Sequence, residues 1–235
     1  MTERVLQIAH IRTGSDDRVT RWLLDQGFDL DLRAPAFGDP LPASTADYAA
    51  LVVYGGPQSA NDETDKAYIA DELAFIRDWV ARGQPILGLC LGAQLIAKAR
   101  GGAVGPHPDG WTEAGYYPVT PTEAGRDTIP EPMHVYHFHG EGFDVPPEGE
   151  LLATGATYPN QAFRIGRHAY GFQFHPEATV PIFTEWMTEV PGMLERPGAQ
   201  PREQHLRGAL DHDEPLAEWL LGFLPRWLAE ARGGP

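Results

Sequence analysis

The single cysteine of the chain, Cys90, lies in the segment PILGLCLGAQ, residues 85–94. Free cysteine is most often a small buried apolar residue, so residue type alone does not make this thiol reactive. Its neighbours change that interpretation, because an apolar run ends at Cys90 and a helical pattern begins at Leu91. A nucleophile on such a strand-to-helix turn needs small neighbours, which Gly88 and Gly92 provide. The segment therefore predicts a nucleophilic thiol.

The helix predicted over residues 91–99 would place the sulfur of Cys90 at a helix N-terminus. There the helix dipole favours a thiolate, and free backbone N–H groups can receive an oxyanion. A parallel sheet would bring the turn Gly55-Gly56-Pro57 beside this helix, so the turn is the predicted source of a second oxyanion donor. Both features serve acyl transfer.

Acyl transfer at a thiol also needs a proton carrier, and the chain has nine histidines. His175 is the candidate, because it directly follows a strand predicted to end at Phe174. Glu177 can accept a hydrogen bond from the second ring nitrogen, and Pro176 stiffens the connection. The alternative is an ordinary solvated turn after a strand. The pattern favours a triad of Cys90, His175 and Glu177 as nucleophile, base and orienting group.

The elements that would position these groups alternate between short strands and helices. The pattern predicts strands at residues 5–11, 28–32, 51–54 and 85–89, and helices near 19–24, at 65–82 and at 91–99. Parallel neighbours need crossover connections, so this alternation predicts an α/β fold with a mainly parallel central sheet and helices on both faces. Further strands are predicted at residues 116–120, 134–138, 151–157, 161–165 and 169–174, in a mixed or antiparallel region.

The C-terminal part of the chain returns to helices. A Pro/Gly-rich break at residues 191–201 divides a predicted main domain, residues 1–190, from a helical extension, residues 191–235, that would pack on the same domain. Apolar residues recur at helical spacing over residues 216–228, and Pro225 predicts a kink or break there. Packing on the sheet is the simplest role. Docking of an acceptor enzyme is the alternative, since Trp219 and Trp227 are typical of interface anchors.

Composition and charge exclude several classes of protein. A net charge of −15 disfavours nucleic acid and anionic membranes as partners. The apolar stretch near the N-terminus is short and has Glu3 and Arg4 beside it, and no apolar run reaches the roughly 18 residues of a membrane span. One cysteine permits neither an internal disulfide nor a metal site made of cysteines. These features predict a folded cytoplasmic protein.

His137 and His139 lie on the same face of a predicted strand and could ligate zinc with a third group. Imidazoles at this spacing are more commonly hydrogen-bonded structural groups, so we expect no metal. The chain also has no Gly-rich phosphate-binding loop. We therefore expect no cofactor, and any ATP-dependent activation of an acceptor would need a separate polypeptide.

Five segments carry a resemblance to a known family. GLCLGAQ, residues 88–94, resembles the nucleophile elbow G-x-C-x-G-x-Q of the class I glutamine amidotransferases, and GFQFHPE, residues 171–177, resembles their terminal H-x-E motif. YGGP, residues 54–57, stands at the oxyanion position. The segments HFHGEGFDVP and NQAFRIG are most similar to free-standing members related to the amidotransferase domain of GMP synthase. The resemblance covers roughly residues 5–178 and implies the flavodoxin-like fold of that family.

The resemblance implies a glutaminase reaction. Cys90 would attack the side-chain amide of glutamine and form a cysteinyl-glutamyl thioester, with the oxyanion held by the backbone N–H groups of Gly56 and Leu91. His175 would protonate the departing ammonia and then activate water. Ammonia would pass to an unknown acceptor.

The resemblance also implies substrate contacts and partners. Gln58 and Gln94 fall where the family contacts the substrate glutamine, and the stretch around His137 would line the substrate side without a metal. A separate synthetase subunit is an expected partner. The alternatives are hydrolysis of γ-glutamyl peptides or conjugates without a partner, and a redox-sensing or non-enzymatic relative that uses a lone elbow cysteine.

Overall fold

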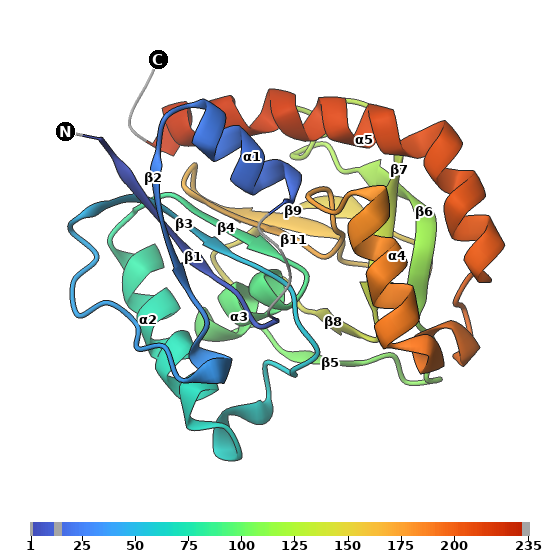
Figure 1. Cartoon of the computed structure of the whole chain (residues 1–235), viewed down its shortest axis with the longest axis horizontal. Helices are drawn as coiled ribbons and strands as arrows, with labels where there is room; N and C mark the ends of the chain where they lie inside the picture. The colour runs from blue at the N-terminus through green and yellow to red at the C-terminus, as the bar shows by residue number, and fades with distance from the viewer. Residues whose placement is uncertain (1, 12–15, 232–235) are drawn as a thin grey trace.

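The computed structural model describes residues 2–11 and 16–231 (Figure 1). Its main sheet has nine strands in the order β2-β1-β3-β4-β11-β10-β9-β6-β7, and β5 and β8 form a two-stranded sheet. The strands are β1 (Arg4–Ile8), β2 (Asp29–Arg33), β3 (Tyr48–Val53), β4 (Ile86–Leu89), β5 (Val104–Pro106), β6 (Glu113–Pro121), β7 (Met133–His139), β8 (Glu141–Phe143), β9 (Glu150–Thr154), β10 (Ala162–Ile165) and β11 (Ala169–Phe172).

The α-helices are α1 (Arg18–Asp25), α2 (Ala67–Ala81), α3 (Leu91–Ala99), α4 (Val180–Glu189) and α5 (Arg202–Ala231). Three short 3₁₀ helices are η1 (Pro35–Phe37), η2 (Asp62–Thr64) and η3 (Pro191–Glu195). None of the helices in the described part of the chain combines the length and the apolarity that crossing a membrane requires.

The sheet has a parallel half and an antiparallel half. Strands β2, β1, β3, β4 and β11 run parallel to one another. Beyond β11, the strands β10, β9, β6 and β7 pair antiparallel. The predicted α/β fold with a mainly parallel core and a mixed region is thus confirmed. The predicted strands over residues 151–157 and 169–174 are shorter than expected, and β5 and β8 were not predicted.

Helices cover both faces of the sheet, as predicted. Val5 and its neighbour Leu6 belong to different apolar clusters, because successive side chains of a strand point to opposite faces. One cluster includes buried residues of α1, α4 and α5, and the other includes buried residues of α2 and α3. Figure 1 shows α1 and α5 on one side of the sheet and α2 and α3 on the other.

The long helix α5 bends along its course and continues through Pro215 and Pro225 (Figure 1). The break considered at Pro225 is therefore wrong. Pro225 is exposed, so water can satisfy the carbonyl that its missing N–H leaves free. Trp227 is buried, and the partly buried Trp219 packs on the same core and donates from Nε1 to the carbonyl of Thr128 at 2.9 Å.

The tryptophans of α5 therefore contact the core rather than a docking surface. The division into residues 1–190 and an extension, residues 191–235, stays a prediction, and residues 232–235 lie outside the described residues.

Close packing between β3 and α3 requires glycine at position 92. A Cβ on Gly92 would lie 2.7 Å from the carbonyl carbon of Val53 and still closer to its oxygen. We expect Gly92→Ala to lower the free energy of unfolding by about 3 kcal/mol in urea titrations, since rigid backbone cannot yield. Gly222→Ala is the control. Its Cβ would meet nothing within 4 Å on α5, so it should raise stability by about 0.5–1 kcal/mol. A Gly92→Ala chain as stable as the parent would contradict this packing.

Candidate active site

Cys90 stands at the junction between β4 and α3 in a strained backbone conformation. Its φ angle is 52° with ψ at −107°, and among the described residues it is the only non-glycine with positive φ. Its N–H donates to the carbonyl of Phe172 in the neighbouring strand β11 at 2.8 Å. A Cβ on Gly88 would lie 2.6 Å from the carbonyl carbon of Gly92, so both glycines allow this tight turn. Such strain persists where surrounding contacts over-determine it, often at functional sites.

His175 reaches Cys90 because β11 lies beside β4, with Phe172 opposite Leu89. The chain leaves the strand after Phe172, two residues earlier than predicted, since the N–H of His175 donates to the carbonyl of Tyr136 in β7 at 2.8 Å. This change of partner turns the chain across the end of the sheet. The imidazole is thereby brought to the thiol, with which it shares a hydrogen bond.

Three neighbours hold the imidazole of His175 in place. Nδ1 lies 2.8 Å from Oε1 of Glu177. The indole of Trp186, from α4, packs edge-on against the ring at a centroid distance of 4.7 Å. Gly55 leaves no room for a side chain, because a Cβ there would lie 2.8 Å from Cε1 of His175 and 3.4 Å from the Cβ of Cys90. The ring is therefore fixed on several sides.

The turn that carries His175 and Glu177 is attached to α1. The backbone N–H of Arg18 donates to the carbonyl of Glu177 at 3.0 Å, and its guanidinium donates to the carbonyl of Pro176 at 3.1 Å. Asp17 caps the same helix by accepting from the N–H groups of Val19 and Thr20. Burial raises the pKa of Asp17, and the nearby Glu177 raises it further.

The electrostatics of the site favour a charged His175. Its side chain is 5% exposed, and burial alone would lower its pKa. The negative charges of Glu177 and Cys90 outweigh burial and raise the pKa to about 10. An imidazolium between a carboxylate and a sulfur can stabilise a thiolate and deliver a proton to a leaving group.

The predicted oxyanion and substrate residues line the same cavity as Cys90, His175 and Glu177, with a volume of about 730 Å³. Leu91 is the first residue of α3, where a backbone N–H has no acceptor within the helix. Gly56 also lines the cavity. The structure thus brings both predicted oxyanion donors to the cavity that contains the thiol.

The two glutamines predicted to contact substrate differ in how they are held. Nε2 of Gln94 donates to the carbonyl of Glu141 at 2.9 Å. Nε2 of Gln58 donates to the carbonyl of His10 at 3.3 Å, while its Oε1 is buried without a partner among the described residues. An unpartnered buried oxygen on a cavity wall is suited to accept a hydrogen bond from a ligand.

Sequence reasoning missed Gln173, which contacts the thiol. Nε2 of Gln173 lies 3.7 Å from Sγ of Cys90, and its Oε1 accepts from Nε2 of Gln94 at 3.3 Å. The available signal was its place two residues before His175, on the same side of an extended segment. A fully buried amide there needs polar partners.

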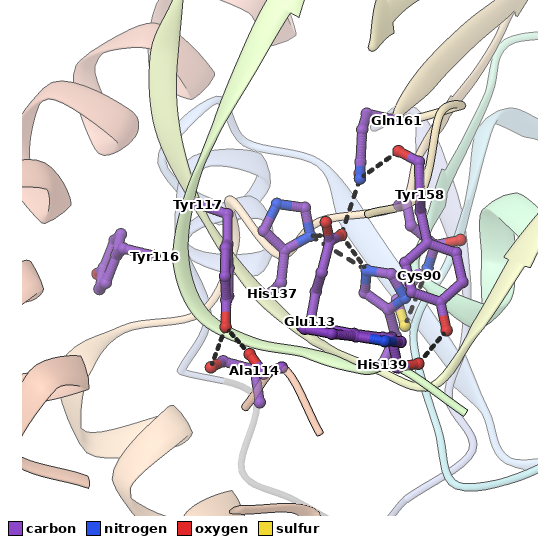
Figure 2. Close-up of polar contacts among 12 residues, drawn as sticks. Cys90, Glu113, Ala114, Tyr116, Tyr117, His137, His139, Tyr158 and Gln161 are labelled. Atoms are coloured by element: carbon purple, nitrogen blue, oxygen red, sulfur yellow. Dashed lines mark hydrogen bonds and ion pairs between the residues drawn. The ribbon is translucent and has the colours of Figure 1, made fainter. Parts of the chain in front are cut away.

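A second polar cluster (Figure 2) adjoins the cavity, which His139 lines. Glu113, His137 and His139 are all buried, and each offers one ligand atom within 4.8 Å of the others. The sequence placed the two histidines on one face but did not identify Glu113, which pairing of β6 with β7 sets opposite His139. Burial lowers the pKa of His137 to about 3, and burial alone would raise the pKa of Glu113, but the adjacent imidazoles hold it at about 2.

The raised pKa of His175 predicts a pH-dependent contribution to stability. In the unfolded chain its pKa is near 6.5 and in the folded chain about 10, so the stabilisation is complete below 6.5 and is lost as pH rises towards 10. We expect the free energy of unfolding in urea to fall more steeply over this range in the parent than in Glu177→Gln, which lacks the main charge that raises the pKa. The exposed Glu185→Gln is the control. If the free energy of unfolding fell equally with pH in the parent and in Glu177→Gln, Glu177 would not be the group that raises the pKa of His175.

The chain is similar to known proteins of one family. Residues 15–187 match the family model for glutamine amidotransferase class-I. The putative glutamine amidotransferase-like protein YfeJ of Salmonella typhimurium is 33% identical over 185 residues, which is 75% of this chain and 77% of that protein. A GMP synthase (glutamine-hydrolyzing) of Acinetobacter baylyi is 30% identical over 136 residues, 55% of this chain and 23% of the synthase.

Solved structures agree over nearly the whole chain. A glutamine amidotransferase from Thermotoga maritima superposes with a TM-score of 0.85 at 25% identity, covering 97% of this chain and 99% of that one. A glutamine amidotransferase from Methylobacillus flagellatus gives 0.87 at 27% identity, covering 97% and 94%. The match of the family model to most of the chain, together with these relatives, shows that the chain belongs to the class I glutamine amidotransferases.

Proposed function

We propose that the chain hydrolyses the side-chain amide of glutamine at Cys90. The observation that carries the proposal is the strained thiol beside an imidazole that Glu177 orients, in a family of glutamine amidotransferases. The thiolate attacks the amide carbon, and the backbone N–H groups of Gly56 and Leu91 receive the oxyanion. Protonated His175 gives its proton to the leaving nitrogen, so ammonia departs and a thioester remains.

The second half-reaction regenerates the enzyme. His175, now neutral, takes a proton from water as the water oxygen attacks the thioester carbon. Glutamate leaves with the new oxygen, and Cys90 returns as a thiolate beside the imidazolium. Glu177 holds Nδ1 of the ring throughout and stabilises the imidazolium each time it forms.

The proposal includes transfer of ammonia to an acceptor bound by a separate synthetase subunit. The GMP synthase of Acinetobacter baylyi matches this chain over 23% of its own length, which leaves most of that protein without a counterpart here. The sequence has no Gly-rich phosphate-binding loop. The proposal assigns activation of an acceptor to that synthetase, while glutamine hydrolysis at Cys90 releases the nitrogen.

A second candidate function is hydrolysis of γ-glutamyl peptides or conjugates without a partner. The cavity of about 730 Å³ is in the size range that encloses drug-sized ligands and is large for glutamine alone. Part of its wall comes from α4, η3 and the residue between them, and includes Ile182, Trp186, Val190 and Met193. These side chains would contact an apolar leaving group on the γ-glutamyl nitrogen.

Removal of the thiol should abolish turnover without unfolding the chain. We expect Cys90→Ser and His175→Ala to reduce glutamate release from glutamine by about 10⁴-fold, since triad members act as a unit. His107→Ala, outside the cavity that contains Cys90, is the matched control and should retain the parent rate. Glutamate release is measured with and without cell extract to supply a partner. Full activity of the Cys90→Ser chain would defeat the mechanism.

The two candidate functions make different predictions for the leaving group. If the apolar wall is used, kcat/KM for γ-glutamyl-leucine should exceed that for glutamine by about 10-fold or more, because the leucine side chain is buried on binding. Met193→Asp should lower the rate with the dipeptide and leave that with glutamine unchanged. Leu210→Asp, at a site 86% exposed on α5, is the control. If the chain turns over glutamine but does not hydrolyse the dipeptide, the second candidate function is excluded and only the glutaminase proposal stands.

A further inference from the structure

We propose that Glu113, His137 and His139 bind one zinc ion, at a site that includes none of the triad residues. The three side chains come from two adjacent antiparallel strands, with Glu113 on β6 opposite His139 on β7. His137 lies two residues before His139, on the same face of β7. Figure 2 shows the ends of the three side chains turned towards one another.

The spacing of the three ligand atoms matches zinc. Nδ1 of His137 lies 3.1 Å from Nε2 of His139, and Oε2 of Glu113 lies 3.1 Å from the latter and 3.4 Å from the former. Tetrahedral zinc with bonds of about 2.0–2.1 Å places its ligand atoms about 3.3 Å apart. Two imidazoles and one carboxylate are also ligands that zinc prefers, and water can take the fourth position.

Hydrogen bonds alone cannot satisfy the three ligand atoms of Glu113, His137 and His139. Each of the three atoms either carries a proton or offers a lone pair, so at least two of the three must be alike and repel. Nδ1 of His139 lies 2.9 Å from the carbonyl of Glu141, which only accepts, so this bond selects the tautomer that carries its proton on Nδ1. Nε2 then offers a lone pair to the carboxylate of Glu113. A cation satisfies all three atoms, because it accepts a lone pair from each.

Because the cluster is buried, the repulsion between like atoms is not screened by water, and a bound ion would be shielded from solvent. The side chains of His137, His139 and Glu113 are 0%, 2% and 2% exposed. Bulk water therefore does not separate the like atoms, and an unsatisfied buried polar pair is destabilising. Zinc would replace this repulsion by three bonds.

Neighbouring groups orient two of the three ligands, Glu113 and His139. Nε2 of Gln161 donates to Oε2 of Glu113 at 2.8 Å and is held by the carbonyl of Tyr158 at 3.1 Å. The bond from Nδ1 of His139 to the carbonyl of Glu141 leaves Nε2 free to ligate. Such outer contacts fix the tautomer and the direction of metal ligands.

The ion would act as a positioning centre for the cavity wall. The carbonyl of Glu141 accepts from Nδ1 of His139 and also from Nε2 of Gln94, both at 2.9 Å. Gln94 in turn contacts Gln173, which lies against the sulfur of Cys90. Zinc on His139 would thus fix the hydrogen bonds beside the thiol without touching the reacting atoms.

The test measures metal content, so it is independent of any amidase activity. The full chain carrying Cys90→Ser, which removes its only thiol, is dialysed against zinc and then against buffer, and zinc is counted by mass spectrometry. We expect about one zinc per chain, and less than about a tenth of that in Glu113→Gln or His139→Gln, because loss of a ligand weakens binding strongly. His205→Gln is the matched control, since His205 is equally buried but bonds to Tyr136 and Gln200.

A spectroscopic measurement covers the case in which a ligand variant does not fold. Cobalt added to the metal-free Cys90→Ser chain should give the visible d–d bands of tetrahedral nitrogen and oxygen ligation, and zinc should raise the melting temperature of the same chain. A Cys90→Ser chain that retains no zinc overturns the proposal. Zinc retained equally in Glu113→Gln and His139→Gln also overturns it, and the cluster is then a hydrogen-bonded network without a metal.

Discussion

The backbone of Cys90 has a φ angle of 52°, a strained conformation that contacts from the neighbouring strands must hold in place. A positive φ at a residue other than glycine costs about 1–3 kcal/mol and needs surrounding contacts that leave no relaxed alternative. Those contacts come from both adjacent strands. Phe172 in β11 accepts the N–H of Cys90, and Val53 in β3 packs so closely on Gly92 that α3 cannot shift. The parallel order β3-β4-β11 therefore also fixes the position of the thiol.

His175 is positioned by the early end of β11, the strand beside β4. His175 gives up pairing along β11 and bonds instead to Tyr136 of β7, which carries it over the end of β4. Glu177 follows within the turn that Arg18 attaches to α1. The carboxylate and the sulfur then outweigh burial and keep the imidazole charged. Tertiary contacts of the turn thus determine both the position and the protonation of His175.

The antiparallel half of the sheet also contributes residues to the wall of the cavity, among them Phe138 and His139 of β7. β6 and β7 place Glu113, His137 and His139 in one buried cluster, and His139 bonds to the carbonyl of Glu141 at the start of β8. Gln94 on α3 bonds to the same carbonyl. The two halves of the sheet are therefore joined at the cavity by polar contacts, where a change in the cluster would move groups beside the thiol.

Residue types and short spacings were enough to predict the strand-to-helix turn at Cys90, the motif with Glu177 two residues after His175, and the alternation of strands and helices that requires a parallel sheet. These depend on residue type and spacing along a few turns of chain. Three features became clear only in the folded chain: which strand lies beside β4, the continuation of α5 through Pro225, and the contact of Glu113 with the two histidines. Strand order, register and burial depend on contacts between residues far apart in the chain, and no local pattern encodes them.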